Sequence, residues 1–231
     1  MPTFGELKTR VANKLNLPST DSASLARIGN AINGAIDFYE EKHLWFNEAT
    51  AQFTTTASNP DLTPLPAALP SDYLYEWEQA GLVLTENNTK YIIKKITHQD
   101  QISIDNSNTE SRPRFYTFTR EKIYLYPVPD KGYTVDLYYI KSYPNLTSDS
   151  QSNDWTNNAD RLIEAKALAD MYLDDRHGID MANRYEQKAE QELRRLQTRS
   201  KKGIATGELT INSLTFDSGN SNLYRMSLLD Y

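Results

Sequence analysis

The residue types that most often carry out chemistry are few in this chain, and their spacing does not bring catalytic groups together. The three histidines, His43, His98 and His177, lack the spacing of a metal site, and each falls near the end of an expected element. Asp174 and Asp175 are adjacent carboxylates, but neighbouring residues on a helix point in different directions. We therefore interpret the histidines as structural and the aspartate pair as part of a solvated helix face.

Other catalytic signatures are missing from the sequence. The chain has no cysteine, which excludes disulfides, thiolate zinc sites and cysteine nucleophiles. Its nine glycines are scattered and form no phosphate-binding loop, and no GxSxG, HExxH or SxxK pattern occurs. The sequence therefore predicts a protein that is not an enzyme and that needs no metal or cofactor.

Composition sets broad limits on the partners of the chain. A net charge of −6 and a pI of about 5.2 argue against a free nucleic-acid binder driven by overall charge, but they allow a local basic patch. Glu6, Lys8 and Arg10 interrupt the apolar stretch that a signal peptide would need. No segment approaches the roughly 20 apolar residues that cross a bilayer. We expect a soluble protein of one or two domains.

Tyrosine is concentrated in one segment. Six tyrosines and three prolines lie between Tyr124 and Pro144. Alternation along the last expected strand places Tyr133 and Tyr139 on one face and Tyr138 on the other. A sheet with aromatic groups on both faces must be covered on both, so these residues predict either the core of a β domain or a protein interface. A carbohydrate-binding platform is a third interpretation. The residues concerned are Tyr124, Tyr126, Tyr133, Tyr138 and Tyr139.

Cationic residues gather near the end of the last expected helix. They are Arg194, Arg195, Arg199, Lys201 and Lys202. Cations at a helix C-terminus interact favourably with the helix dipole, by about 0.3–1 kcal/mol each, so the run has a structural explanation. Contact with phosphate or with an acidic partner is the functional alternative.

Helical periodicity occurs at the two ends of the chain. A first helix is predicted from Phe4 to Leu15. A second helix, capped by Asp21 or Ser22, has an apolar face that reaches Tyr39 and is expected to end at His43 to Trp45. Gly29 and Gly34 weaken the second helix or mark close packing against a neighbour. An alanine-rich helix that is apolar on much of its surface follows Ala159, and Asp180 caps a last helix that ends in the basic run.

The region between these helices has the two-residue period of strands. Runs at 45–56, 115–118, 123–126 and 134–140 alternate, and two more flank a hairpin turn at Glu86-Asn87-Asn88. Pro127 and Pro129 lie where a strand leaves the sheet, and Asp130-Lys131-Gly132 supplies a turn that makes a tyrosine-rich hairpin with the next strand.

The order of elements predicts an α+β fold. A helical bundle is built from residues 1–44 and 157–202, an antiparallel β domain is inserted at 45–156, and an extended C-terminal arm follows at 203–231. The arm has too many apolar groups for a free tail and no helical period. These groups are Leu209, Ile211, Leu214, Phe216, Leu223, Tyr224 and Met226.

Several motifs occur in an order that belongs to a known family. Arg112-Pro113-Arg114-Phe115-Tyr116 is followed by Ile123-x-Leu125-x-Pro127-x-Pro129-Asp130, and then by Tyr133 and Leu137-Tyr138-Tyr139. Before them, Leu69-Pro70-Ser71-Asp72-Tyr73 leads into the β region, and after them Trp155 precedes the alanine-rich helix. In this order and spacing, residues 1 to about 200 resemble bacteriophage head–tail adaptor proteins, also called head-completion or connector proteins.

The resemblance implies a structural protein of the virion without catalysis or cofactor. Such proteins form a ring, usually a dodecamer, beneath the portal, extend the DNA channel and present a platform for the tail. The implied partners are the portal protein, other copies of the chain, a downstream tail or nozzle protein, and genomic DNA that passes non-specifically, with no membrane. The implied location is the head–tail junction, after assembly in the host cytoplasm.

Within this hypothesis the singled-out residues acquire expected roles. The basic run at 194–202 is expected to contact the portal or line the channel, and the apolar groups of the arm to bind a neighbouring subunit or the portal. The tyrosines form the core or the interface of the β domain. The alternative function is a tail-associated carbohydrate-binding β module, whereas a hydrolase has no motif to support it.

Overall fold

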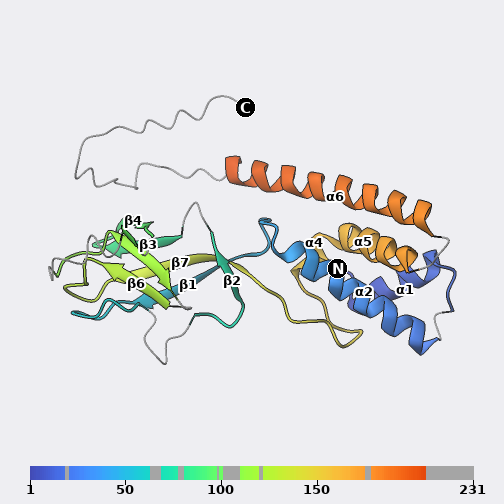
Figure 1. Cartoon of the computed structure of the whole chain (residues 1–231), viewed down its shortest axis with the longest axis horizontal. Coiled ribbons are helices and arrows are strands. Elements are labelled where there is room, and N and C mark those ends of the chain that lie inside the picture. Colours follow the sequence, from blue (N-terminus) through green and yellow to red (C-terminus); the bar gives the residue numbers. More distant parts are fainter. Residues whose placement is uncertain are drawn as a thin grey trace. The chain divides into compact units, whose positions relative to one another are not determined.

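The computed structural model describes residues 1–18, 21–62, 69–77, 81–97, 99–100, 110–119, 122–174 and 178–206. Helices from both ends of the chain pack together, and strands lie between them in the sequence (Figure 1). The predicted α+β fold is therefore confirmed.

The chain divides into two compact units. The first combines Met1–Ala51, Pro70–Trp77 and the residues from Tyr138 to the end of the last helix, and the second contains Gln52–Leu69 and Glu78–Leu137. The chain passes between the units inside two of its strands, at positions 51–52 and 137–138.

The two N-terminal helices begin at well-formed caps. In α1 (Phe4–Lys14), Thr3 Oγ1 accepts from Glu6 N–H while Glu6 Oε2 accepts from Thr3 N–H, which is a capping box. In α2 (Ser22–Glu40), Asp21 accepts from Ala23 N–H and is the cap, as predicted. The apolar faces of both helices are buried, as their periodicity indicates.

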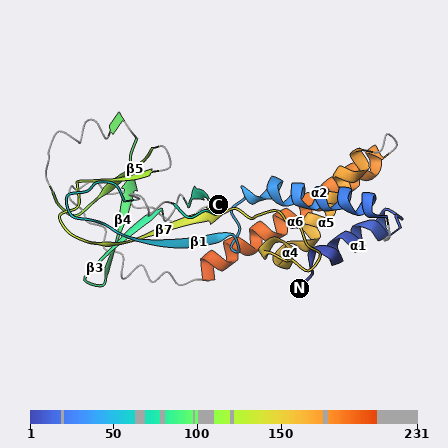
Figure 2. The same ribbon diagram turned by 90° about the horizontal axis from the view of Figure 1, so that it is seen from below.

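The C-terminal helices complete the bundle. They are α4 (Asp154–Asn158), α5 (Asp160–Leu173) and α6 (Ile179–Thr206). Helix α5 contacts α1, α2 and α6, and Figures 1 and 2 show α6 running along α5. A single buried cluster joins residues such as Leu7, Ile32, Trp155 and Leu168, so the predicted packing of terminal helices into one bundle is confirmed.

Three details of these helices differ from the sequence prediction. Asp180 lies in the first turn of α6 rather than at its cap, a position where a carboxylate also favours the helix dipole. Helix α6 continues to Thr206 instead of ending at Lys202. Leu173, which belongs to the apolar pattern of α5, is 59% exposed because it lies in the last turn.

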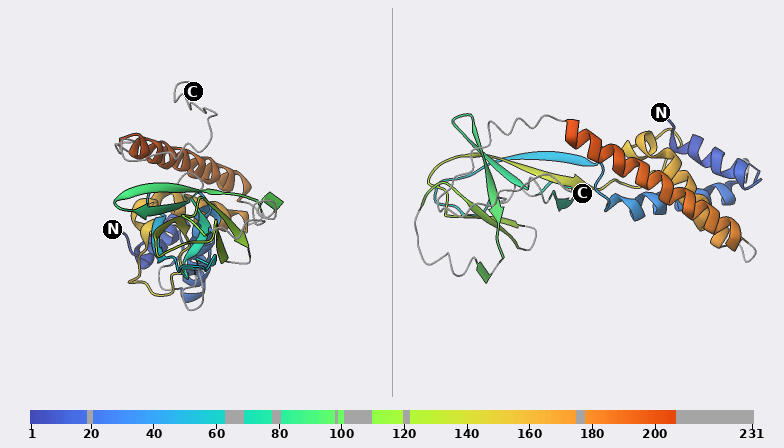
Figure 3. Two further views of the ribbon diagram at one scale, coloured as in Figure 1. Left: turned by 90° about the vertical axis from the view of Figure 1, so that its left-hand side faces the viewer. Right: turned by 90° about the horizontal axis from the view of Figure 1, so that it is seen from above.

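The described strands form one curled sheet. They are β1 (Glu48–Thr54), β2 (Tyr73–Glu76), β3 (Leu82–Glu86), β4 (Thr89–Lys95), β5 (Phe115–Thr119), β6 (Lys122–Tyr126) and β7 (Thr134–Lys141). The order is β1-β7-β3-β4-β5-β6, and β2 also pairs with β7. The chain after β1 bonds to β6, through Leu62 N–H to Ile123 O at 2.9 Å and Leu125 N–H to Pro60 O at 2.8 Å. These bonds bring the sheet round on itself, and Figure 3 shows the curl.

The hairpin predicted at Glu86-Asn87-Asn88 is present between β3 and β4. These strands pair antiparallel from Leu82 opposite Ile93 to Glu86 opposite Thr89. Asn87 and Asn88 have φ values of 48° and 62°, and asparagine tolerates this left-handed conformation better than most residues. The local turn signal was therefore sufficient to predict this hairpin.

Two strand pairings differ from the prediction. Strands β6 and β7 do not form the predicted tyrosine-rich hairpin, because β6 pairs with β5 while β7 lies between β1 and β3. Strands β4 and β5 pair in parallel, through Lys94 with Phe115 and Lys95 with Tyr116, whereas the β2–β7, β3–β4, β3–β7 and β5–β6 pairs are antiparallel. Both differences arise from pairing between strands that a local pattern does not specify.

The two glycines of α2 lead to a prediction about stability. A Cβ at Gly29 would lie 3.2 Å from Phe4 Cζ, whereas at Gly34 nothing lies within 4 Å. Gly34→Ala is therefore expected to raise the free energy of unfolding by about 0.5–1 kcal/mol, the usual helix preference for alanine over glycine. Gly29→Ala should give a smaller gain or a loss, because the Phe4 ring must move. Urea unfolding of the two variants compares them, and an equal gain from both would show that Phe4 does not restrict position 29.

Candidate functional site

The basic run lies on the last turns of α6, where most of its side chains already have contacts. Arg194 pairs with Glu190 at 3.5 Å and Arg195 with Glu192 at 3.3 Å, and both arginines are mostly exposed. The Arg199 guanidinium carbon lies 4.5 Å from the centroid of the Trp45 ring. Lys201 is exposed, and the side chain of Lys202 lies outside the described part of the chain.

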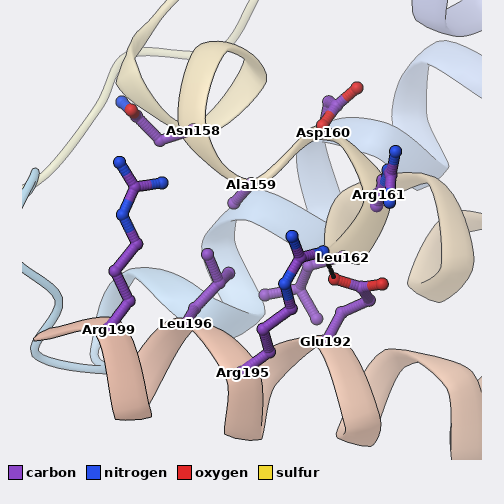
Figure 4. A pocket seen from close by; sticks show the side chains of 9 residues that line it. All are labelled: Asn158, Ala159, Asp160, Arg161, Leu162, Glu192, Arg195, Leu196 and Arg199. Atoms are coloured by element: carbon purple, nitrogen blue, oxygen red, sulfur yellow. Dashed lines mark hydrogen bonds and ion pairs between the residues drawn. The ribbon is translucent and has the colours of Figure 1, made fainter.

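Arg195 and Arg199 border a groove between α6 and the start of α5. Its volume is about 210 Å³, and Figure 4 shows Arg195 and Arg199 rising from α6 toward the turn that joins α4 to α5. We call it the arginine groove. It is lined by Asn158, Ala159, Asp160, Arg161, Leu162, Glu192, Arg195, Leu196 and Arg199.

Local sequence explains why this groove forms. Asn153 and Thr156 make a reciprocal capping box that starts α4, with both bonds at 3.0 Å. Trp155 is fully buried and packs edge-on against Phe46, with ring centroids 5.0 Å apart. Ala159, at φ −128° and ψ 24°, then separates α4 from α5. Helix α5 therefore begins beside α6, close to Arg195.

The charges of the groove do not balance. The Asp160 carboxylate is held by Arg10 at 2.9 Å, and Glu192 faces Arg195. Arg161 is exposed and forms no ion pair with any described residue. Guanidinium groups offer paired N–H donors that match carboxylate and phosphate oxygens. The geometry thus suits an anionic partner.

Ion pairs join α1 to α5 at one end of this region. Lys14 binds Glu164, which is 8% exposed, and Arg10 lies 4.0 Å from the same carboxylate. The sequence does not predict these pairs, because about 150 residues separate the partners. The charge of Glu164 is therefore compensated within the fold.

The five tyrosines are placed mainly as packing residues. Tyr126, Tyr133 and Tyr139 are buried, and Tyr124 and Tyr138 are half-buried. Tyr133 OH donates to Asp130 at 2.7 Å in the second unit, and Tyr139 OH donates to Asp72 at 2.9 Å in the first. Burial and the adjacent Asp72 raise the pKa of Tyr139 to about 12. Each hydroxyl is therefore a proton donor at neutral pH.

The other singled-out residues have simpler positions. His43 Nε2 lies 2.8 Å from Glu48 Oε1 near the end of α2, and Asp174 pairs with Arg27 at 3.4 Å. His98, His177 and Asp175 lie outside the described residues. So do all seven apolar arm residues from Leu209 to Met226.

Sequence reasoning missed two partners at the site. It did not connect Arg199 with Trp45, which are 154 positions apart, or Tyr139 with Asp72. The motif that contains Asp72 was noticed only as a step into the β region. No local signal pairs such distant residues.

Within the part of the chain that the structure describes, no group of three or more His, Asp or Glu side chains is placed to hold a metal ion. None of the helices described is both long enough and apolar enough to cross a membrane.

Comparison with known proteins identifies the family. No curated protein sequence matches the chain. Residues 2–210 match the family described as SU10 adaptor protein, which covers the bundle and the sheet together. A match over this much of the chain identifies its family. The chain belongs to the SU10 adaptor protein family, whose members are head–tail adaptors of phages.

Proposed function

We propose that this protein forms a ring below the portal of a phage head, extends the DNA channel and presents the platform to which the tail attaches. The family match over residues 2–210 is the observation that carries the proposal. The proposed partners are the portal, other copies in a dodecamer, a downstream tail or nozzle protein, and DNA that slides through.

The charge of the chain suits a channel. A surface with many cations would bind DNA phosphates and slow their passage, because cation–phosphate contacts dominate non-specific affinity. The chain has a net charge of −6, and its cations at the end of α6 are partly paired with Glu190 and Glu192. DNA is therefore proposed to pass without being held tightly.

The regions of the chain are proposed to have separate roles in the ring. The bundle of residues 1–44 and 157–202, and in particular the basic run at 194–202, contacts the portal or lines the channel. The β region at 45–156 faces other copies and the tail. The arm from residue 203 onward ties the subunit to the portal or to its neighbour.

A carbohydrate-binding role has less support. A sugar platform needs exposed aromatic rings that can stack on the ligand. Tyr126, Tyr133 and Tyr139 are only 5%, 4% and 5% exposed, so the tyrosines that suggested such a platform are largely unavailable to it.

Charge reversal tests the role of the basic run. The double variant Arg195→Glu/Arg199→Glu is expected to bind the portal at least about tenfold more weakly, which is roughly 1.4 kcal/mol, because it replaces two cations with carboxylates at the proposed contact. Co-sedimentation with the portal protein from the same phage measures the change.

The matched control is Lys42→Glu/Lys90→Glu, which changes net charge equally at two other exposed positions. If the arginine variant bound the portal as tightly as this control, the cations of the basic run would act only by stabilising the helix dipole.

Truncation tests the arm. Removing residues 207–231, beyond the end of α6, is expected to leave the thermal unfolding of the bundle unchanged and to weaken ring attachment, because the apolar arm groups supply the tie. Differential scanning calorimetry and electron microscopy on portals measure the two effects. Rings as stable as those of the full chain would assign the arm another role.

A further inference from the structure

A second hollow of the bundle adjoins the arginine groove and is bordered by cations. It lies between α1, α5 and α6, has a volume of about 380 Å³, and shares Asp160, Arg161 and Glu192 with the groove. We call it the cationic cleft. The exposed cations in its lining are Arg10, Lys14, Arg161 and Lys188.

The positive charge of this cleft is only partly compensated. The ion pairs described above already engage its three carboxylates, Asp160, Glu164 and Glu192. Arg161 and Lys188 are exposed and form no ion pair with any described residue. Figure 4 shows Arg161 apart from the ion pair that Glu192 makes. Two cations of the cleft therefore remain for a partner.

The side of the bundle formed by α2, α5 and α6 has the opposite charge. Lys166 of α5, whose side chain is 13% exposed, contacts Asp170 at 3.1 Å and Glu186 at 3.2 Å. Glu190 lies one turn beyond Glu186 and pairs with Arg194 at 3.5 Å, but an exposed pair of this kind contributes little. We call Asp170, Glu186 and Glu190 the acidic flank. Its three carboxylates share one mostly buried lysine and one weak surface pair.

Two aromatic residues of α2 lie at this flank. Burial raises the pKa of Tyr39 to about 12, and the three carboxylates of the acidic flank add to the rise, so all three lie near one hydroxyl. Phe38 is 56% exposed, and Lys166 Nζ lies 4.7 Å from its ring centroid. The acidic flank thus has an accessible apolar ring beside it, and aromatic residues are enriched in protein interfaces.

The cationic cleft and the acidic flank lie on opposite sides of the α5–α6 pair. On α6, Glu186 and Glu190 are each two residues from Lys188, which turns them about 160° away from it. On α5, Arg161 and Asp170 are about two and a half turns apart, so they also point to opposite sides. A subunit with unlike, complementary surfaces on two sides can bind its own copies head to tail. Such contacts generate a ring when the rotation between copies closes.

We propose that the acidic flank of one copy binds the cationic cleft of the next copy, with Glu186 and Glu190 against Lys188 and Arg161. This contact compensates both surfaces at once, whereas DNA in the cleft would leave the acidic flank uncompensated. The inference rests on the proposed ring and names a contact between its copies, in addition to that of the β region. Neither cation belongs to the basic run, whose proposed contact with the portal or the channel is unaffected.

Charge reversal on each surface tests the contact in the full-length protein. The cleft variant is Arg161→Glu/Lys188→Glu, and the flank variant is Glu186→Lys/Glu190→Lys. Each change sets like charges against each other between copies. Each variant alone is therefore expected to self-associate at least about tenfold more weakly than the unmodified protein, which is roughly 1.4 kcal/mol. Sedimentation velocity at high protein concentration and low ionic strength, where surface charges are least screened, measures the association.

Mixing the two variants identifies the partners. In an equimolar mixture, the unchanged flank of the cleft variant meets the unchanged cleft of the flank variant, and the two reversed surfaces meet each other. Every contact then joins opposite charges again, so the mixture should associate within about threefold of the unmodified protein.

Two further pairs of substitutions serve as controls. Lys42→Glu/Lys90→Glu has the same net charge as the cleft variant and changes neither surface, so it should associate like the unmodified protein. Glu186→Lys places a second lysine beside Lys166, and thermal unfolding shows whether the flank variant is still folded. If it is not, the single variants Lys188→Glu and Glu190→Lys repeat the mixing experiment with the contact between Lys166 and Glu186 intact.

Three results would each overturn the inference: an unmodified protein that stays monomeric under these conditions, a cleft variant that associates as well as its charge-matched control, or a mixture that associates no better than its components. No portal is present in this experiment. Its outcome is therefore separate from portal binding, which the Arg195→Glu/Arg199→Glu variant tests.

Discussion

Replacing Leu168 with aspartate is expected to lower the free energy of unfolding of the bundle by about 4 kcal/mol or more. Leu168 has no exposed surface and lies in the cluster that joins the N- and C-terminal helices. Removing a buried leucine side chain alone costs about 2–5 kcal/mol, and a buried carboxylate without a partner adds a desolvation cost. Because domains are stable by only about 5–15 kcal/mol, the variant should be largely unfolded near physiological temperature.

Leu173 supplies the matched control for this change. It lies in the same helix, five positions further on, and is 59% exposed, so Leu173→Asp should change stability by no more than about 1 kcal/mol. Circular dichroism during thermal unfolding compares the two variants. Unchanged stability of Leu168→Asp would mean that this face of α5 is exposed and that the bundle is packed differently.

Replacing Trp155 with alanine should be the second large loss, at about 3–5 kcal/mol. The side chain is fully buried, and it makes an edge-on contact with Phe46 beside the turn where α4 gives way to α5. Its loss leaves a cavity in the buried cluster that joins the N- and C-terminal helices. Guanidinium chloride unfolding measures the change.

Trp155→Phe separates packing from hydrogen bonding. The Trp155 Nε1 group has no hydrogen-bond partner among the described residues, so phenylalanine removes an unsatisfied polar atom while it keeps an aromatic ring beside Phe46. We expect a loss well below that of the alanine variant. If both variants lost the same stability, the indole N–H would have a partner that matters, and packing would not explain the effect.

The sequence was sufficient to predict those parts of the fold that a local pattern determines. The apolar positions of α2 recur at helical spacing and are buried, and Asn87-Asn88 marks the β3–β4 turn. It was insufficient where distant segments choose partners. Nothing local shows that β7 lies between β1 and β3 instead of beside β6. The same holds for Gly29 and Gly34, which look alike until Phe4 is placed beside one of them.

The candidate site likewise has one part that the sequence predicts and one part that it does not. The basic run could be read directly, because its members are close in sequence. The groove could not, because it forms where α6 meets a helix that starts 35 positions before Arg195, at Asp160. Arg161, which has no role in the sequence prediction, is one of its three arginines. The packing of the bundle, which long-range contacts determine, is what brings these residues together.

Electron microscopy of the protein mixed with the portal from the same phage tests the central claim most directly. The account predicts a ring of copies bound to one end of the portal and coaxial with its channel, with twelve subunits as the expected number. A protein that stays separate from the portal at high concentration of both would contradict the account, and so would copies bound singly around the portal without enclosing a channel.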